Sequence, residues 1–120
     1  MKVAIVGSPH FHKDITKYIP LDTSWLIIGQ ETGVGEQAMA YARHRGLPLV
    51  ILYPPYMSSG PRLRARDQQL VELADQLVVI QDDWTDSAND KALVAYARRQ
   101  KKLVHEVRFS VDDSSNRLRR

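Results

Sequence analysis

The chain has 120 residues, of which 43% are hydrophobic and 26% are charged, and its formal net charge is +3. This is an ordinary composition for one globular domain, and the absence of cysteine excludes disulfides, thiol catalysis and cysteine-bound zinc. We expect a cytoplasmic protein without a membrane span, because the apolar run after Lys2 is too short for a secretory signal and no run approaches the roughly 20 apolar residues of a spanning helix.

Five short apolar runs, rich in Val, Ile and Leu, predict the strands. They are Val3–Val6, Trp25–Ile28, Leu49–Tyr53, Leu77–Ile80 and Leu103–Val107. The middle runs are nearly continuous, which is typical of strands buried on both faces of a parallel sheet. The spacing of successive runs is close to the ~30 residues of a βαβ unit.

Segments with helical spacing separate these runs. The first, near residues 13–19, is short and ends at Pro20. The other three predict helices whose inner faces carry Ala38, Tyr41, Ala42 and Arg45, then Leu63, Leu70, Leu73, Ala74 and Leu77, and finally Ala88, Ala92, Ala95, Tyr96 and Arg99. Right-handed crossovers would place helices on both faces of the sheet. Residues 1–109 therefore predict one three-layer α/β/α domain of Rossmann-like type with a five-stranded parallel sheet, and residues 110–120, which lack periodicity, predict a mobile C-terminal tail.

Ligands of open α/β sheets bind beyond the carboxyl ends of the strands, so the loops after the strands are the candidate site. The loop after the second strand contains Gly29, Gly33, Gly35 and Glu36 and opens a helix. Its glycines let the backbone turn tightly and bring N–H groups close to a ligand, and the helix start adds a positive dipole end. These features favour a bound phosphate or carboxylate. The alternative is a tight turn whose glycines serve packing.

Three sharper interpretations fail. A Walker A loop is not supported, because Glu36 occupies the lysine position and Gln37 the Ser/Thr position. Gly33–Ala38 fits the dinucleotide fingerprint, but it follows the second strand and no ribose-binding acid ends the next one. We expect no metal site at His10 and His12, because residues two apart do not share a helical face and no third ligand is evident.

Small and polar residues also follow the first and fourth strands. Gly7 and Ser8 end the first strand, where Ser8 could donate a hydrogen bond to a phosphate, although a plain turn explains the pair equally well. Asp82 ends the fourth strand and could bind a ribose hydroxyl. Ser87 precedes the last helix and fits a capping box with Asp90, and this position is compatible with an anion contact as well.

A basic cluster precedes the third helix. Arg62, Arg64 and Arg66 lie where the helix should begin, and cations there oppose the helix dipole. This cost suggests a bound anion, whereas the alternative is a solvated basic face. Ser59 and Gly60 could add hydroxyl and backbone donors.

The order of these motifs resembles the SLOG superfamily of Rossmann-like domains, especially its small YspA-like members, over roughly residues 2–108. The resemblance is carried by Val3–Ser8, Ile28–Gly29 with Gly33–Ala40, Arg66–Asp67, Ala74–Ile80 and Asp86–Ser87. It implies the strand order 3-2-1-4-5 and a site for a nucleotide or an ADP-ribose-like derivative. By motif match, the ligand-binding residues are Gly7, Ser8, Gly29, Gly33, Gly35, Arg66 and Ser87.

The sequence therefore predicts binding of a small anionic ligand of the nucleotide type, in a sensor or carrier role. One alternative is a nucleotide N-glycosidase with Glu36 or Asp90 as the acid. However, the catalytic glutamate of the similar LOG-type phosphoribohydrolases has no counterpart, and Gln81–Asp83 stands at their Pro-Gly-Gly stretch. Another alternative is a single-stranded nucleic-acid-binding module that uses the arginine cluster, which the modest net charge ranks last. No cofactor is certain, and a homodimer is left open.

Overall fold

A computed structural model describes residues 1–8, 11–52, 65–82 and 88–109, with only the backbone at positions 65, 66, 82, 88 and 89. The strands are β1 (Lys2–Gly7), β2 (Trp25–Ile28), β3 (Leu49–Ile51), β4 (Gln76–Asp82) and β5 (Leu103–Phe109). The helices are η1 (Thr16–Tyr18), α1 (Val34–Arg45), α2 (Ala65–Leu73) and α3 (Ala88–Arg99).

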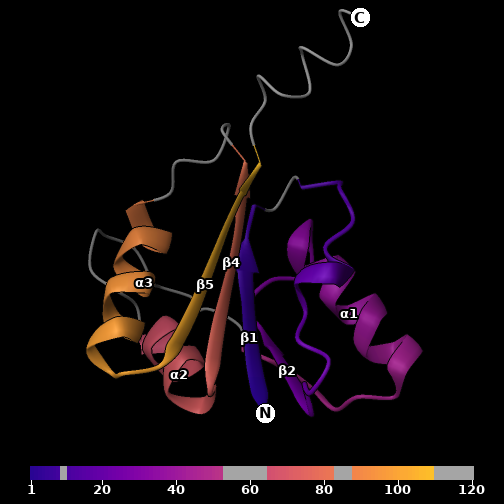
Figure 1. The fold of residues 1–120 in the computed structure, drawn as a ribbon, viewed down its shortest axis with the longest axis horizontal. Helices are drawn as coiled ribbons and strands as arrows, with labels where there is room; N and C mark the ends of the chain where they lie inside the picture. The colour runs from indigo at the N-terminus through magenta and orange to yellow at the C-terminus, as the bar shows by residue number, and fades with distance from the viewer. Residues whose placement is uncertain (9–10, 53–64, 83–87, 110–120) are drawn as a thin grey trace, which may run out of the picture.

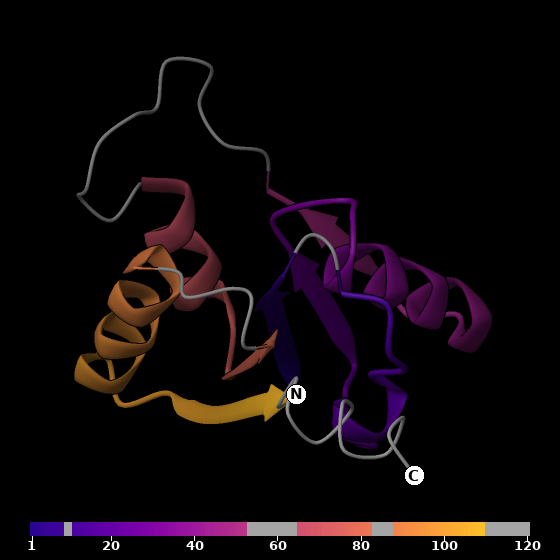
Figure 2. The same cartoon turned by 90° about the horizontal axis from the view of Figure 1, so that it is seen from above.

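The five strands form one parallel sheet in the order β3-β2-β1-β4-β5. Helices α2 and α3 cover one face of this sheet, and η1 and α1 cover the other (Figures 1 and 2). The predicted α/β fold, its layers and its strand order are confirmed. Parallel strands need crossover connections, and the helices between the strands supply them.

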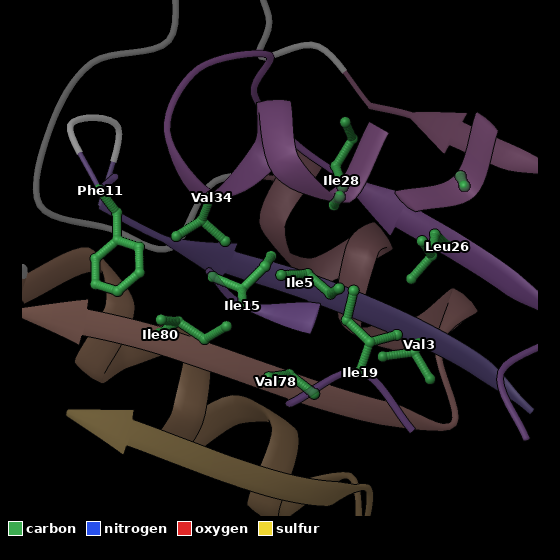
Figure 3. Close-up of a cluster of buried hydrophobic side chains, with 12 residues drawn as sticks. Val3, Ile5, Phe11, Ile15, Ile19, Leu26, Ile28, Val34, Val78 and Ile80 are labelled. Carbon is green, nitrogen blue, oxygen red and sulfur yellow. The ribbon is translucent and has the colours of Figure 1, made fainter. Parts of the chain in front are cut away.

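Successive strand residues point to opposite faces of the sheet and divide the core into two clusters. Val3 and Ile5 of β1 belong to the cluster under η1 and α1, whereas Ala4 belongs to the cluster under α2 and α3. Figure 3 shows the first cluster, in which Phe11 and Val34 pack over the strand side chains. Burying each such aliphatic side chain contributes about 1.5–3 kcal/mol, so both faces of the sheet help to stabilise the fold.

Three local predictions need correction. The described part of the first connection has a 3-10 turn at Thr16–Tyr18 in place of a longer helix, since Pro20 leaves little room for one. Arg45 and Leu73, predicted on the inner faces of α1 and α2, are exposed. The predicted inner face of α3 is wrong in part: Ala95 and Arg99 are exposed, while Leu93, Val94 and Ala97 are buried. The larger Leu93 and Val94 side chains bury more apolar area than alanines do, and this gain sets the rotation of the helix.

The expected strand end at Tyr53 and the expected tail 110–120 lie outside the described residues. Within the described part of the chain, no helix has the length and apolar character needed to cross a membrane.

Candidate functional site

A small cavity of about 60 Å³ lies at the carboxyl ends of β1 and β2, on the face covered by α2 and α3. Sites for drug-sized ligands usually measure roughly 300–1,000 Å³, so this cavity has room for only a small part of a ligand. Its described lining residues are Ile5, Val6, Gly7, Gly29, Gln30, Asp67, Leu70, Asp90 and Leu93.

The cavity lies at the switch point of the strand order. The chain leaves β1 toward η1 on one face of the sheet, and it leaves β4, the neighbour of β1, toward α3 on the other face (Figure 2). The two connections diverge at the carboxyl ends of these strands and leave a crevice between them. The topology alone therefore makes this rim the place where a ligand is expected.

Two carboxylates line the cavity. Asp67 is the third residue of α2 and is 2% exposed, and Asp90 is the third residue of α3 and is half-buried. A carboxylate in the first turn of a helix is stabilised by the helix dipole, which accounts for each acid separately. It does not account for their placement on one cavity. The charged side chains that line the cavity, among the described residues, are these two acids.

Hydrogen bonds hold Asp90 toward the end of β4. The Gln81 side chain donates from Nε2 to Asp90 Oδ2 at 2.7 Å, and Arg108 Nη2 lies 3.5 Å from Gln81 Oε1. Gln81 is buried, so its amide has little freedom to turn away from these two partners. Asp90 therefore has a fixed acceptor geometry beside the cavity.

Gln30 joins the loop after β2 to the end of β1. Its side-chain amide donates to the carbonyl oxygen of Gly7 at 3.1 Å and to that of Thr32 at 3.3 Å. Because Gln30 also lines the cavity, these bonds fix one wall of the site. The Gln30 amide therefore has a structural role at this position.

The glycines at Gly7 and Gly35 are required by neighbouring backbone. A Cβ atom at Gly7 would collide with the carbonyl oxygen of Ile80, and one at Gly35 would collide with that of Gln30. Gly33 has φ 56° and turns the chain into α1, in a conformation that other residues rarely adopt. These contacts correspond to the packing alternative that the sequence left open.

The amide groups at the start of α1 are bound within the protein. Val34 donates its N–H to the carbonyl oxygen of Ser8 at 3.2 Å, and Gly35 donates to that of Thr32 at 3.0 Å. Ser8 is 1% exposed, and its own N–H donates to the carbonyl oxygen of Ile80 at 3.2 Å. Two of the donors predicted to bind a phosphate are therefore bound to carbonyl groups of the protein, one in the same loop and one after β1.

The structure brings together part of the predicted site. Gly7 and Gly29 line the cavity, whereas Gly33, Gly35 and Glu36 do not; Glu36 is exposed on α1, across the sheet from α2. The backbone of Arg66 lies in the first turn of α2, beside Asp67, and Asp82 ends β4, but neither side chain is described.

The remaining predicted residues, Ser59, Gly60, Arg62 and Ser87, lie outside the described residues, and their roles stay predictions. Gln30 and Asp67 are not part of the predicted site, and Asp90 belongs to it only in the capping and enzyme alternatives. A usable signal existed, because Asp67 precedes Leu70 and Asp90 precedes Leu93 by three residues. Each acid therefore extends the buried face of its helix toward the strand ends.

Within the described ranges, no group of three potential metal-ligating side chains comes together. No protein-family model, no curated protein and no solved structure matches the chain. The resemblance to the SLOG superfamily therefore stays a prediction.

Proposed function

We propose that this protein binds a nucleotide-derived small molecule at the carboxyl ends of β1 and β2, in a sensor or carrier role. One observation carries the proposal: Asp67 and Asp90, from two different helices, line a single cavity at the switch point of the sheet. The fold supplies the position of the site, and the two acids supply its chemistry.

The acids favour the sugar of such a ligand over its phosphate as the group inside the cavity. Ionised carboxylates only accept hydrogen bonds, and vicinal ribose hydroxyls donate them. A phosphate between two carboxylates would instead be repelled from both. The volume of about 60 Å³ also suits a small polar group better than a whole nucleotide. We therefore place the phosphate outside the cavity, toward the Arg66 end of α2.

Binding measurements on matched ligands test this proposal. Calorimetry would compare AMP and ADP-ribose with their 2′,3′-dideoxy counterparts. We expect Asp67→Asn to weaken binding of the hydroxyl-bearing ligand about tenfold or more, because a hydrogen bond to a charged group is lost. The dideoxy ligand should bind the wild type and Asp67→Asn about equally. Asp22→Asn is the matched control, since Asp22 is exposed and precedes β2, at the opposite end of the strands from the cavity.

Two results would contradict the proposal. One is the absence of binding by any ligand of the panel to the folded wild-type chain. The other is an affinity that Asp67→Asn and Asp22→Asn leave equally unchanged. Circular dichroism of each variant would show that the folded state is intact in these comparisons.

A nucleotide N-glycosidase is the second candidate, and the placement of Asp90 favours it over other enzymes. Of the two acids proposed from the sequence, Asp90 lines the cavity, whereas Glu36 is exposed on the other side of the sheet. In such a reaction the sugar–base bond breaks, water oxygen bonds to the sugar carbon, and the base leaves with a proton. Release of free base from AMP or NAD, lost in Asp90→Asn, would support this activity. Intact substrate after prolonged incubation with the wild type would dismiss it.

A further inference from the structure

The two edges of the sheet differ in length. The β3 edge has three paired residues, Leu49–Ile51, whereas the β5 edge has seven, Leu103–Phe109. Beyond β5, in the part of the chain that the structure describes, no further strand is paired, and the ribbon lies open on that side (Figures 1 and 2). Long edges invite pairing with another chain, and proteins usually protect them with prolines, bulges or lysines. Residues 103–109 contain no proline, glycine or lysine.

The backbone direction of β5 identifies which of its groups face outward. The N–H of Leu103 donates to the carbonyl oxygen of Asp75, the residue before β4, at 3.4 Å. Peptide groups of successive strand residues point alternately to the two sides of the strand. The odd-numbered residues of β5 therefore bond to β4, and the N–H and C=O groups of Val104, Glu106 and Arg108 point away from the sheet.

We propose that a second copy of this chain pairs with that edge, so that two β5 strands run antiparallel across a two-fold axis at Val107. In this register Glu106 lies opposite the partner's Arg108, and the same pair recurs by symmetry. Both residues point their backbone groups outward, so they can exchange two N–H···O bonds, as hydrogen-bonded antiparallel pairs do. Opposite charges directly across a strand pair stabilise it.

Charge distinguishes this register from its nearest alternatives. A two-fold axis at Glu106 would put two glutamates opposite each other, and an axis at Arg108 would pair two arginines. An axis at His105 would place Arg108 opposite the partner's Lys102. Like charges in these positions are destabilising. Only the axis at Val107 makes the pattern Glu106-Val107-Arg108 self-complementary.

The side chains of the monomer are compatible with this pairing. Glu106 is about half exposed and already forms an ion pair with Arg98 of α3 at 2.7 Å. Its second carboxylate oxygen can therefore receive the partner's Arg108 without loss of that contact. On the other face of the sheet, His105 meets the partner's Phe109, and the two Val107 side chains meet at the axis. In the monomer, Arg108 Nη2 also lies 3.5 Å from Gln81 Oε1. A guanidinium has five N–H donors, so this contact does not exclude a bond to the partner's Glu106. The proposal does not depend on the proposed function.

Sedimentation velocity of the full chain over a concentration series tests the proposal. We expect a reversible dimer of the wild type. Arg108→Glu would place glutamates opposite each other twice and should weaken dimerisation about tenfold or more. The double variant Glu106→Arg with Arg108→Glu exchanges the charges and should restore it. Arg45→Glu is the control for net charge, because Arg45 is exposed at the end of α1.

Amide hydrogen exchange distinguishes this interface from others. The amides of Glu106 and Arg108 should become protected as the protein concentration rises, while those of Val107 and Phe109 are protected throughout. A chain that is monomeric at every concentration overturns the proposal. So does a dimer that Arg108→Glu leaves intact, or protection of the outward amides that is independent of concentration, because another part of the same chain would then cover the edge.

Discussion

The two faces of the sheet differ at its carboxyl end. On the face of η1 and α1, Phe11 packs over Val34 and Ile80, and its ring centroid lies 5.0 Å from that of Phe109 (Figure 3). On the face of α2 and α3, Asp67 and Asp90 line a cavity instead. We call these the closed face and the open face. A glycine-rich loop follows β2 into α1 on the closed face. Each α-helix has an acid as its third residue, but Glu36 of α1 is exposed, whereas Asp67 and Asp90 line the cavity on the open face.

The difference between the two faces shows which sequence pattern indicates a ligand site. The glycine pattern from Gly29 to Gly35 indicates close backbone packing. A Cβ atom at Gly35 would collide with the carbonyl oxygen of Gln30, and the Gly35 N–H donates to the carbonyl oxygen of Thr32. Carboxylates are costly to bury, and the open face holds Asp67, which is 2% exposed, and the half-buried Asp90, which accepts a hydrogen bond from Gln81. Two acids from different helices on one cavity are therefore a stronger indication of a site in this molecule than the glycine pattern.

The largest loss of stability is expected when the Phe11 side chain on the closed face is removed. Phe11→Ala deletes a side chain that is 3% exposed, and we expect a loss of about 3–5 kcal/mol in the free energy of unfolding. Urea denaturation measures this loss. Leu21→Ala is the control, because Leu21 is 85% exposed and should cost less than about 0.5 kcal/mol. Equal stability of the two variants would show that the closed face is not packed as described.

The next largest effect should come from Gly7, which both faces share. Gly7→Ala pushes a methyl group against the Ile80 carbonyl and the Val34 side chain, and we expect a loss of about 1–3 kcal/mol. Gly46→Ala is the matched control, since Gly46 has φ 67° but open space around it. That variant should cost about 1 kcal/mol through backbone strain alone. A smaller loss at Gly7 than at Gly46 would contradict the close approach of β1 and β4.

Most of the fold could be predicted because buried strands are continuous apolar runs in the sequence. Runs such as Trp25–Ile28 match their strands, and the connection lengths leave room for crossovers. The prediction failed where small differences in area decide the outcome, as on α3, where Leu93 and Val94 displaced the alanine stripe from the core. The sequence could not distinguish the 3-10 turn at Thr16–Tyr18 from a short helix, because three residues are too few to show a helical period.

The candidate site could be predicted only as a location. Strand ends follow from the order of the elements, and Gly7 and Gly29 were found in this way. The place of Asp67 follows from its spacing to Leu70, a predicted inner residue, so it could have been predicted. The place of Asp90 depends on the rotation of α3, which the alanine stripe assigned wrongly. Nor does the sequence show that the Val34 amide is bound within the protein, because its partner, the Ser8 carbonyl, lies on another segment.

A smaller loss of stability is expected when the Gln30 side chain, which joins the loop after β2 to the end of β1, is removed. Gln30→Ala removes the bonds from its amide to the carbonyl oxygens of Gly7 and Thr32, and we expect a loss of about 1 kcal/mol. Hydrogen exchange should show faster opening of the loop before α1 than in the wild type. Unchanged exchange in this loop would mean that the glycine packing alone holds it, and that the Gln30 wall of the cavity is independent of the closed face.

The smallest effects should appear at opposite ends of the pH scale. On the open face, the Tyr96 hydroxyl donates to Glu72 Oε1 at 2.6 Å, and this bond, with burial second, raises the pKa of Tyr96 above 10.0. On the side of η1, hydrogen bonds from the Thr16 N–H and hydroxyl lower the pKa of Asp14 below 3.8. Folding thus favours the neutral phenol on one face and the ionised carboxylate on the other.

Linkage gives each effect its sign. The contribution of Tyr96 is present below pH 10 and is lost as pH rises through its raised folded-state pKa, so wild type and Tyr96→Phe should converge in stability in strong alkali. The contribution of Asp14 is present above pH 3.8 and is lost as pH falls through its lowered pKa, so wild type and Asp14→Asn should converge in acid. Melting temperatures across the pH range measure both differences, which should be small because both groups are solvent-accessible. A Tyr96→Phe difference that persists unchanged far above pH 10 would show that packing of the ring, rather than its bond to Glu72, joins α3 to α2.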